Sequence, residues 1–200
     1  MDALVMAGGR GSRLSMGEKP LVELEGRVLL DRVIEALAKS SASRISVAVT
    51  QNAPRTRAWC LDRGIEVLDT SGMGYVPDMV EAVEMTGAVG PVMVIMADLP
   101  LLTGALLDRI SAIYQERPEP ALSCHTTLEL HRRIGRRPDA VFRYHGRFIV
   151  PAGVNILKGS CIREEQEDFH LIMDLLELAV NVNTQDDLAL CRRILRGELL

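Results

Sequence analysis

This sequence is poor in aromatic residues and has no excess of positive charge. Its 200 residues include three Phe, three Tyr and one Trp, and the formal net charge at pH 7 is −4. Proteins that bind single-stranded nucleic acid stack the bases on aromatic side chains, and proteins that bind duplexes present a broad basic face. The composition therefore argues against nucleic acid as a partner, and any positive charge that matters for function must be local.

Cysteines and long apolar runs are also scarce. Four cysteines are present, far apart and without a C-x-x-C pair: Cys60, Cys124, Cys161 and Cys191. This spacing disfavours a disulfide framework or a structural zinc site and is typical of reduced thiols in a cytoplasmic protein. No apolar run reaches about 18 residues and no signal peptide is visible, so no membrane span is expected. With 48% apolar and 25% charged residues, the chain is predicted to fold as a single domain over residues 1–200.

What the sequence does contain is a glycine-rich loop directly after an apolar segment. Residues 4–7 are typical of a buried strand, and three of the next four residues are glycine. Glycine lacks a Cβ, so the backbone can approach a ligand closely, and successive N–H groups can form a concavity for an anion. Three cations stand beside these glycines: Arg10, Arg13 and Lys19. The pattern predicts a polyphosphate cradle, with a plain strand-to-loop connection as the alternative.

Two better-known phosphate loops do not fit this stretch. The dinucleotide fingerprint G-x-G-x-x-G requires a third glycine where Leu14 stands. The P-loop G-x-x-x-x-G-K-[ST] requires a lysine directly after the last glycine, but Gly17 is followed by Glu18, and Pro20 occupies the hydroxyl position. A different kind of nucleotide site is therefore indicated.

The first loop and three later segments resemble a known family. Residues 6–14, followed by Glu18-Lys19-Pro20, resemble the signature of the sugar-nucleotide and cofactor nucleotidyltransferases. Together with the segments 69–75, 150–155 and 181–188, they resemble the archaeal-type adenosylcobinamide-phosphate guanylyltransferases over nearly the whole chain. That family transfers GMP from GTP to the phosphate of a corrinoid intermediate in cobalamin biosynthesis. The resemblance implies GTP and a phosphorylated corrinoid as partners; the sequence does not fix the oligomeric state, and a homodimer stays open.

The resemblance also implies roles for individual residues. Nucleotide binding is expected of Ala7, Gly8, Gly9, Arg10, Gly11, Ser12, Arg13, Lys19, Asp69, Thr70, Ser71, Gly72, Gly74 and Asp98. Within this set Arg13 and Lys19 would neutralise charge at the α-phosphate and leaving pyrophosphate, and Asp98 would bind Mg²⁺. Acceptor binding is expected of Gly153, Asn155, Asn181 and Asn183.

Residue types alone leave structural alternatives open for these segments. Residues 69–71 are also typical of helix caps, and Asp98 could cap the helix expected over 103–115. Residues 151–155 could form an ordinary turn, and 181–183 an ordinary strand-to-helix junction.

Along the chain, apolar strand segments alternate with helical ones. Strands are expected at 45–49, 65–68 and 91–97, with helices between them. This alternation predicts an α/β fold with a Rossmann-like, doubly wound, mostly parallel but mixed sheet and helices on both faces. The resemblance implies the nucleotide-diphospho-sugar transferase type.

The second half of the chain is predicted in less regular pieces. A polar, arginine-rich and flexible excursion near the second substrate is expected over 125–139, with a solvated loop as the alternative. A hairpin is expected around residues 145–146. A helix is expected over 164–177, a strand over 179–183, and a last helix capped by Thr184.

The chemistry implied here requires no general base. A phosphate monoester has a second pKa near about 6 and is largely dianionic at neutral pH, in agreement with a sequence that lacks an evident Ser-His-Asp or Cys-His constellation. Two rival functions remain. Asp98-Leu99-Pro100 also resembles the molybdenum-cofactor guanylyl- and cytidylyltransferases. The other rival is a non-catalytic nucleotide-binding regulatory module, against which the retention of Arg13, Lys19 and Asp98 argues.

Overall fold

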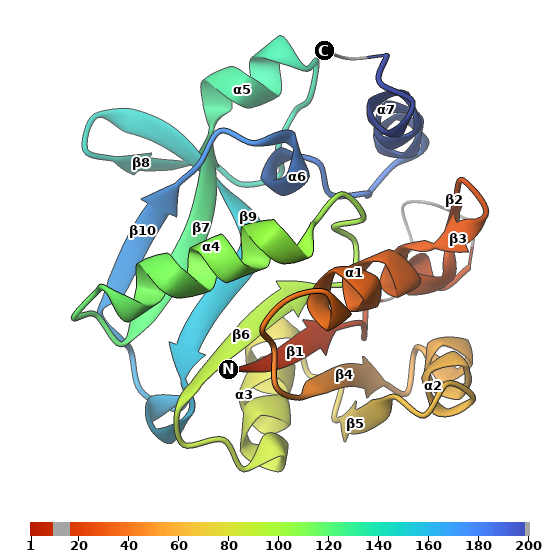
Figure 1. Cartoon of the computed structure of the whole chain (residues 1–200), viewed down its shortest axis with the longest axis vertical. Coiled ribbons are helices and arrows are strands. Elements are labelled where there is room, and N and C mark those ends of the chain that lie inside the picture. The colour runs from red at the N-terminus through yellow and green to blue at the C-terminus, as the bar shows by residue number, and fades with distance from the viewer. Residues whose placement is uncertain (10–16, 199–200) are drawn as a thin grey trace.

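A computed structural model describes residues 1–9 and 17–198. They form three layers, a central sheet with helices on each of its faces (Figure 1). The strand order is β10-β7-β9-β6-β1-β4-β5, with β8 paired to β9. The strands are β1 (Asp2–Met6), β4 (Ile45–Thr50), β5 (Glu66–Thr70), β6 (Pro91–Met96), β7 (Ala121–Thr127), β8 (Phe142–Tyr144), β9 (Arg147–Lys158) and β10 (Asp168–Ile172). A separate hairpin is formed by β2 (Glu23–Leu24) and β3 (Arg27–Val28).

Helices cover both faces of this sheet. The α-helices are α1 (Leu29–Ala38), α2 (Pro54–Leu61), α3 (Tyr75–Thr86), α4 (Gly104–Gln115), α5 (Leu128–Arg133), α6 (Leu176–Ala179) and α7 (Gln185–Leu195). The 3₁₀ turns are η1 (Lys19–Leu21) and η2 (Gly159–Cys161). Figure 1 shows α1 and α4 over one face and α3 over the opposite face. The predicted α/β fold with a mixed sheet is confirmed.

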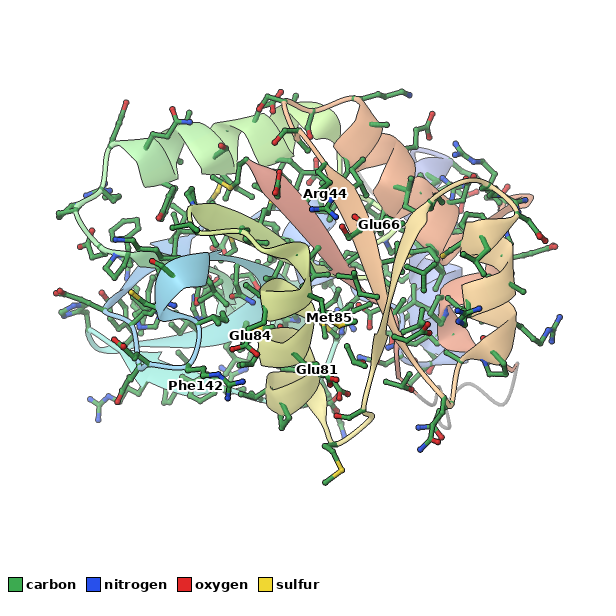
Figure 2. The ribbon with its side chains drawn as sticks, turned by 90° about the horizontal axis from the view of Figure 1, so that it is seen from below. Arg44, Glu66, Glu81, Glu84, Met85 and Phe142 are labelled. Carbon is green, nitrogen blue, oxygen red and sulfur yellow. The ribbon has the colours of Figure 1, made fainter. Side chains whose placement is uncertain are left out.

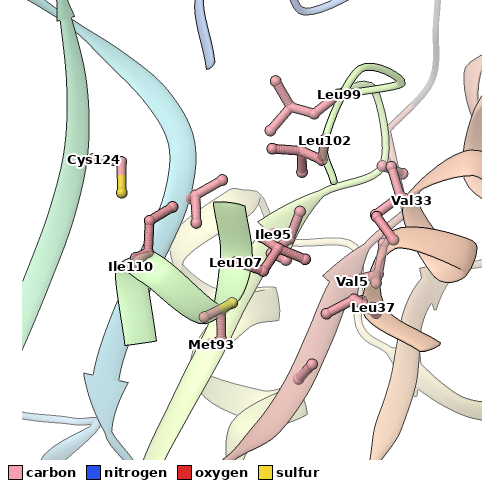
Figure 3. Close-up of a cluster of buried hydrophobic side chains, with 14 of the residues drawn as sticks. Val5, Val33, Leu37, Met93, Ile95, Leu99, Leu102, Leu107, Ile110 and Cys124 are labelled. Atoms are coloured by element: carbon pink, nitrogen blue, oxygen red, sulfur yellow. The ribbon is translucent and has the colours of Figure 1, made fainter. Parts of the chain in front are cut away.

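Strand β1 is buried on both faces, which explains its continuous apolar run. Val5 packs with Val33 and Leu37 of α1 in the core between the sheet, α1 and α4 (Figure 3). Leu4 and Met6 point the other way and pack in the core under α3. Burying side chains of this size stabilises the fold by roughly 1.5–3 kcal/mol each.

The direction of the strands places the functional loops at their carboxyl ends. β6 and β4 are parallel to β1, β5 is parallel to β4, and β10 is parallel to β7. β9 runs antiparallel to both β6 and β7, so β7 points the same way as β6. The chain leaves β1 for β4 and β5 on one side and returns to β6 on the other. Ligands of open α/β sheets bind outside the carboxyl ends of strands at such a switch point.

The amino ends of these strands carry a structural ion pair. Arg44 and Glu66 lie side by side at the amino ends of β4 and β5 (Figure 2). Glu66 also accepts a hydrogen bond of 2.5 Å from the hydroxyl of Ser46. These charges hold neighbouring strands together and lie away from the carboxyl ends of β1 and β6.

The arginine-rich segment 125–139 is more ordered than predicted, so that prediction is wrong for its first half. β7 continues to Thr127, and α5 follows directly. The Thr127 side chain caps α5 by accepting from Leu130 N at 3.3 Å, and its own N–H and hydroxyl donate to Asp174. Leu130 and His131 of α5 are buried. The sequence pattern did not reveal α5, because a helix of six residues needs few apolar side chains and therefore shows no clear apolar period.

Two predictions for the C-terminal third are also wrong. Residues 168–172 form strand β10 instead of part of a helix, because Phe169 and Leu171 alternate with polar neighbours and complete the sheet beside β7. Residues 180–183 do not join the sheet; Val182 donates its N–H to the Asp98 carbonyl at 2.9 Å, and its side chain packs in a separate apolar cluster with Leu188 of α7. The cap at Thr184 is confirmed. Within the described part of the chain, no helix combines the length and hydropathy needed to cross a bilayer.

Candidate active site

Gly8 closes the end of β1 against the neighbouring strand. The Thr50 hydroxyl donates to the Gly8 carbonyl at 2.9 Å, and a Cβ on Gly8 would lie 2.5 Å from the Thr50 methyl carbon. Ala7 is buried and donates its N–H to Ala48 at 2.8 Å. Gly9 is exposed, and a Cβ there would meet no described atom within 4 Å. Close strand packing therefore requires glycine at position 8, whereas Gly9 leaves its backbone open at the switch point.

The rest of the first loop is described only where it ends. Arg10, Gly11, Ser12 and Arg13 lie outside the described residues, so their part in phosphate binding stays a prediction. Glu18 accepts the backbone N–H groups of Arg55 at 2.9 Å and Thr56 at 2.6 Å. Its carboxylate thus caps α2 from a distant part of the chain. The sequence held a signal for this cap, because Ala53 before Pro54 offers no capping side chain.

Lys19 joins two side chains that come from distant segments. Its ammonium group donates to Asp98 Oδ2 and, at 2.7 Å, to Asn183 Oδ1. Asp98 is the second residue after the end of β6, and Asn183 precedes α7. The structure therefore brings three of the predicted site residues together at the switch point between β1 and β6.

The Asp98 carboxylate has capacity for one more positive partner. Asp98 is 4% exposed, and its Oδ1 atom is buried without a hydrogen-bond partner among the described residues. A buried polar group left unsatisfied costs about 1–3 kcal/mol. The alternative role as a helix cap is wrong, because the Thr103 side chain caps α4 by accepting from Leu106 N at 3.3 Å. The free oxygen is therefore suited to a cation or a donor from a ligand.

The loop between β5 and α3 is held by acidic residues of the helix. Asp78 accepts the N–H groups of Gly72 at 2.8 Å and Met73 at 3.1 Å, and Glu81 accepts the N–H of Ser71 at 2.8 Å. Gly74 is the N-cap of α3 and no side chain caps it, so the capping alternative for residues 69–71 is wrong. Both loop glycines have positive φ, 75° at Gly72 and 127° at Gly74, which favours glycine at each.

Asp69 and Thr70 have partners of their own. Arg57 donates to both carboxylate oxygens of Asp69, at 2.8 Å to Oδ1 and 2.9 Å to Oδ2. These hydrogen bonds and the Arg57 charge lower the pKa of Asp69. The Thr70 hydroxyl donates to the Val49 carbonyl at 3.0 Å. Asp69 is exposed, so its carboxylate remains reachable, and recognition of the base by Asp69 stays a prediction.

Gly153 and Asn155 both lie within strand β9, where the turn considered as an alternative is absent. Gly153 has a φ of 74°, and a Cβ there would lie 2.9 Å from the Met96 Cγ, so the glycine permits close approach to the end of β6. The Asn155 side chain lies near the hydroxyl of Tyr75 on α3, because burial raises the pKa of Tyr75 and Asn155 lowers it. The structure therefore assigns packing roles to both residues, and an acceptor role for them stays a prediction.

Asn181 and Asn183 instead border a cavity of about 730 Å³ near the carboxyl ends of the parallel strands. One wall is residues 131 and 134–140, a second is 150–152, and the third comes from 178–193. Gly153 and Asn155 are not part of its lining. The four predicted acceptor residues thus divide into two pairs in different places. Residues 131 and 134–139 of the arginine-rich segment also line this cavity. That this segment lies near the second substrate stays a prediction.

His131, on the cavity wall, makes stability depend on pH. Burial lowers its pKa to about 4, while its Nε2 pairs with the Thr126 hydroxyl at 2.8 Å. An unfolded histidine titrates near about 6.5, so between these values the unfolded chain binds more protons than the folded one. The free energy of unfolding should therefore fall as pH decreases through this window, by up to about 3 kcal/mol.

Urea denaturation at pH 7 and pH 4.5 measures this effect. We expect His131→Gln to lose less stability than the wild type over this interval. His145→Asn is the matched control, because His145 is exposed. An identical pH dependence in wild type and His131→Gln would contradict the prediction.

Known proteins resemble this chain in sequence and in fold. Residues 3–167 match the family described as MobA-like NTP transferase domain. An adenosylcobinamide-phosphate guanylyltransferase of Methanocaldococcus jannaschii is 33% identical over 208 aligned residues, covering 99% of each chain. A molybdenum cofactor guanylyltransferase of Shewanella halifaxensis is 31% identical over 115 residues, covering 56% of this chain and 54% of its own length.

A solved structure supports the same fold. CMP:2-keto-3-deoxy-manno-octonic acid synthetase, solved in complex with CTP, superposes with a TM-score of 0.75 at 14% identity over 99% of both chains. This likeness concerns the fold, whereas the family match and the full-length relative concern the sequence itself. With its glycine-ended first strand and the Lys19–Asp98–Asn183 cluster, the chain belongs to the MobA-like NTP transferase domain family of nucleotidyltransferases.

Proposed function

We propose that this chain transfers GMP from GTP to the phosphate of adenosylcobinamide phosphate, giving adenosylcobinamide-GDP and pyrophosphate in cobalamin biosynthesis. The observation that carries the proposal is the convergence of Lys19, Asp98 and Asn183 at the switch point. The full-length relative named above bears the same activity in its name. The molybdenum-cofactor relative matches little more than half of this chain and supports the rival function less strongly.

The proposed step is an in-line displacement at the α-phosphorus of GTP. An oxygen of the acceptor's phosphate monoester forms the new P–O bond, and the bond from the α-phosphorus to the bridging oxygen breaks as pyrophosphate leaves. The dianionic acceptor carries its own nucleophilic electron pair, so the protein needs only to align the reactants and neutralise charge. Lys19 supplies a positive charge at this position, and Gly9 leaves room for the nucleotide to approach the end of β1.

The residues present fit a magnesium ion. Asp98 offers a buried carboxylate oxygen that has no partner in residues 1–9 and 17–198, and carboxylate oxygens are ligands that Mg²⁺ prefers. In the described residues no group of three or more His, Cys, Asp or Glu is arranged for a metal, so phosphate oxygens and waters would complete the coordination. Such an ion supplies charge neutralisation to the phosphate oxygens when bound.

The acceptor is assigned to the cavity beside Asn183. Its lining combines exposed arginines, Arg137 and Arg193, with apolar residues such as Ile134 and Leu190. An acceptor with a phosphate and a large apolar body suits both kinds of wall. Asn183 borders the cavity and also contacts Lys19, so it is placed to face both substrates.

We assign the reaction to the cytoplasm. Cys60, Cys124 and Cys191 are buried free thiols, as expected of a reducing compartment. Burial raises the pKa of the Cys124 thiol to about 12, which keeps it protonated and unreactive at neutral pH.

Pyrophosphate release with GTP, Mg²⁺ and each candidate acceptor tests the function. Adenosylcobinamide phosphate should release pyrophosphate in equal amount to a new guanylated product identified by mass spectrometry. If the molybdenum cofactor were the one acceptor that supports turnover, the result would favour the rival transferase. If no acceptor gave pyrophosphate release, the result would favour a regulatory module.

Base selectivity is a further prediction at Asp69. A carboxylate can accept from the two N–H donors of guanine that adenine lacks, so the wild type should prefer GTP to ATP. Losing hydrogen bonds to a charged group costs about 1.5–3 kcal/mol, so Asp69→Ala should reduce this preference about 10- to 100-fold. Competition between the two nucleotides in the pyrophosphate assay measures the ratio.

The control for this variant is Glu66→Ala. Glu66 lies on the same strand and is also paired with an arginine, but at the opposite end. It should keep wild-type selectivity. Equal use of GTP and ATP by the wild type would remove Asp69 from the base site.

A further inference from the structure

We infer that Arg136 is a positioning residue for this reaction: it fixes the segment that holds the Asn183 amide oxygen on Lys19. The inference rests on the proposed function for the role of Lys19. It concerns a residue on the cavity wall that contacts neither Lys19 nor Asp98 in any hydrogen bond of the described residues.

Arg136 uses all three of its nitrogen atoms to clamp the opposite wall of the cavity. Its Nε donates to Asp187 Oδ1 at 2.9 Å, and its Nη2 donates to the carbonyl and the side-chain oxygen of Asn181, each at 2.9 Å. Its Nη1 donates to the carbonyl of Ala179. The side chains of Arg136 and Asp187 are 9% and 11% exposed. The planar fork of arginine can reach these acceptors together, which a lysine ammonium cannot.

Asp187 passes this constraint on to Asn183. Its second oxygen, Oδ2, accepts the N–H groups of Asn183 and Thr184, each at 2.9 Å, and the Thr184 hydroxyl at 3.0 Å. The backbone of Asn183 is therefore fixed directly beside the side chain that accepts from Lys19 at 2.7 Å. Arg136, Asp187, Asn183 and Lys19 form a continuous path from the cavity wall to the switch point.

The path couples the two proposed substrate sites. Arg136, Asn183 and Asp187 all border the cavity, so an occupant of the cavity lies beside one end of the path while the other end holds Lys19. α7 has independent anchors, because Thr184 caps it and Leu188 and Cys191 are buried. Loss of the clamp should therefore loosen residues 179–183 more than it unfolds the helix.

Kinetics of Arg136→Met test the inference. A misplacement of about 1 Å can lower the rate about 100-fold, so we expect kcat at saturating substrates to fall about 10- to 100-fold while KM for GTP changes less than about 3-fold. Arg133→Met is the matched control, since Arg133 is exposed on α5 and does not line the cavity. It removes the same charge and should keep the wild-type kcat.

A double-mutant cycle separates positioning from general destabilisation. In an Asn183→Ala background the path is already broken, so Arg136→Met should lower kcat less than about 3-fold further. A purely structural role would lower kcat equally in both backgrounds, and that result would overturn the inference. If Arg136→Met does not fold, Arg136→Lys keeps the charge without the fork and should lower kcat in the same direction; a folded variant with wild-type kcat would overturn it.

Acylation of Lys19 gives a readout that does not need turnover. With an amine-reactive reagent and peptide mass spectrometry, Lys19 should be labelled several-fold faster in Arg136→Met than in the wild type or Arg133→Met. Faster labelling in a protein without transferase activity would mean that the proposed function fails while the positioning path stands. Unchanged labelling in a folded variant would overturn the path.

Discussion

Replacing Lys19 by alanine is expected to lower kcat by about 100- to 1,000-fold in a protein that still folds. The ammonium group is the cation that the described residues place on Asp98 and Asn183 at the switch point, 2.7 Å from the Asn183 oxygen. Removing one preorganised donor from a transition state costs on the order of 2–4 kcal/mol, by analogy with oxyanion holes. Pyrophosphate release at saturating GTP and acceptor measures the loss.

The effect on folding must be measured beside the effect on turnover. Lys19→Ala leaves the Asp98 carboxylate without its ion-pair partner, and breaking a buried pair is destabilising. The Lys19 side chain is 20% exposed, which moderates this cost because water can reach the vacated position. Lys19→Arg, which keeps the charge, should retain more activity than Lys19→Ala at comparable thermal stability. Wild-type turnover in a folded Lys19→Ala protein would contradict the assignment.

The parts of the fold that follow from local pattern could be predicted from the sequence. The apolar run that became β1 is buried on both faces, and the run 91–96 became the central strand β6. Both are continuous because helices cover the sheet on each side. The burial of β6 also singled out Asp98, because a carboxylate at the tip of a buried strand needs a partner.

The wrong predictions fell where tertiary pairing decides the structure. Residues 168–172 form a strand because β7 offers an open edge, and no local feature of the preceding acidic stretch announces this edge. Residues 179–183 have the alternation of a strand but bind the Asp98 carbonyl and an apolar cluster instead. Propensity is a weak guide when long-range contacts compete with it.

The missed residues share one property: each acts on a distant segment. Glu18 caps α2, and Arg136 clamps residues 179–187. The spacing of residues in the sequence carries no information on such pairs. The sequence contained two signals: a helix start at Pro54 without a capping side chain, and a cluster of arginines beside a predicted acceptor site. Neither signal shows which distant residue is the partner.

Asp98→Asn is expected to remove the dependence of nucleotide binding on Mg²⁺ and to lower kcat by about 1,000-fold or more. The amide keeps the size of the side chain, but it replaces a charged ligand by a neutral one, and magnesium sites in enzymes depend on one or two carboxylates. The oxygen concerned is Oδ1, which is buried and has no partner among the described residues.

Binding of a fluorescent GTP analogue, with Mg²⁺ or with EDTA, separates the metal effect from the loss of turnover. The wild type should bind the nucleotide more tightly with Mg²⁺, and Asp98→Asn should bind it equally under both conditions. Asp108→Asn is the matched control, because it removes an exposed carboxylate from α4 that is bonded to Ser41; it should keep the metal effect. Retention of the metal effect by a folded Asp98→Asn protein would mean that the ion is held elsewhere, since a ligand cannot be lost without changing the affinity that it supplies.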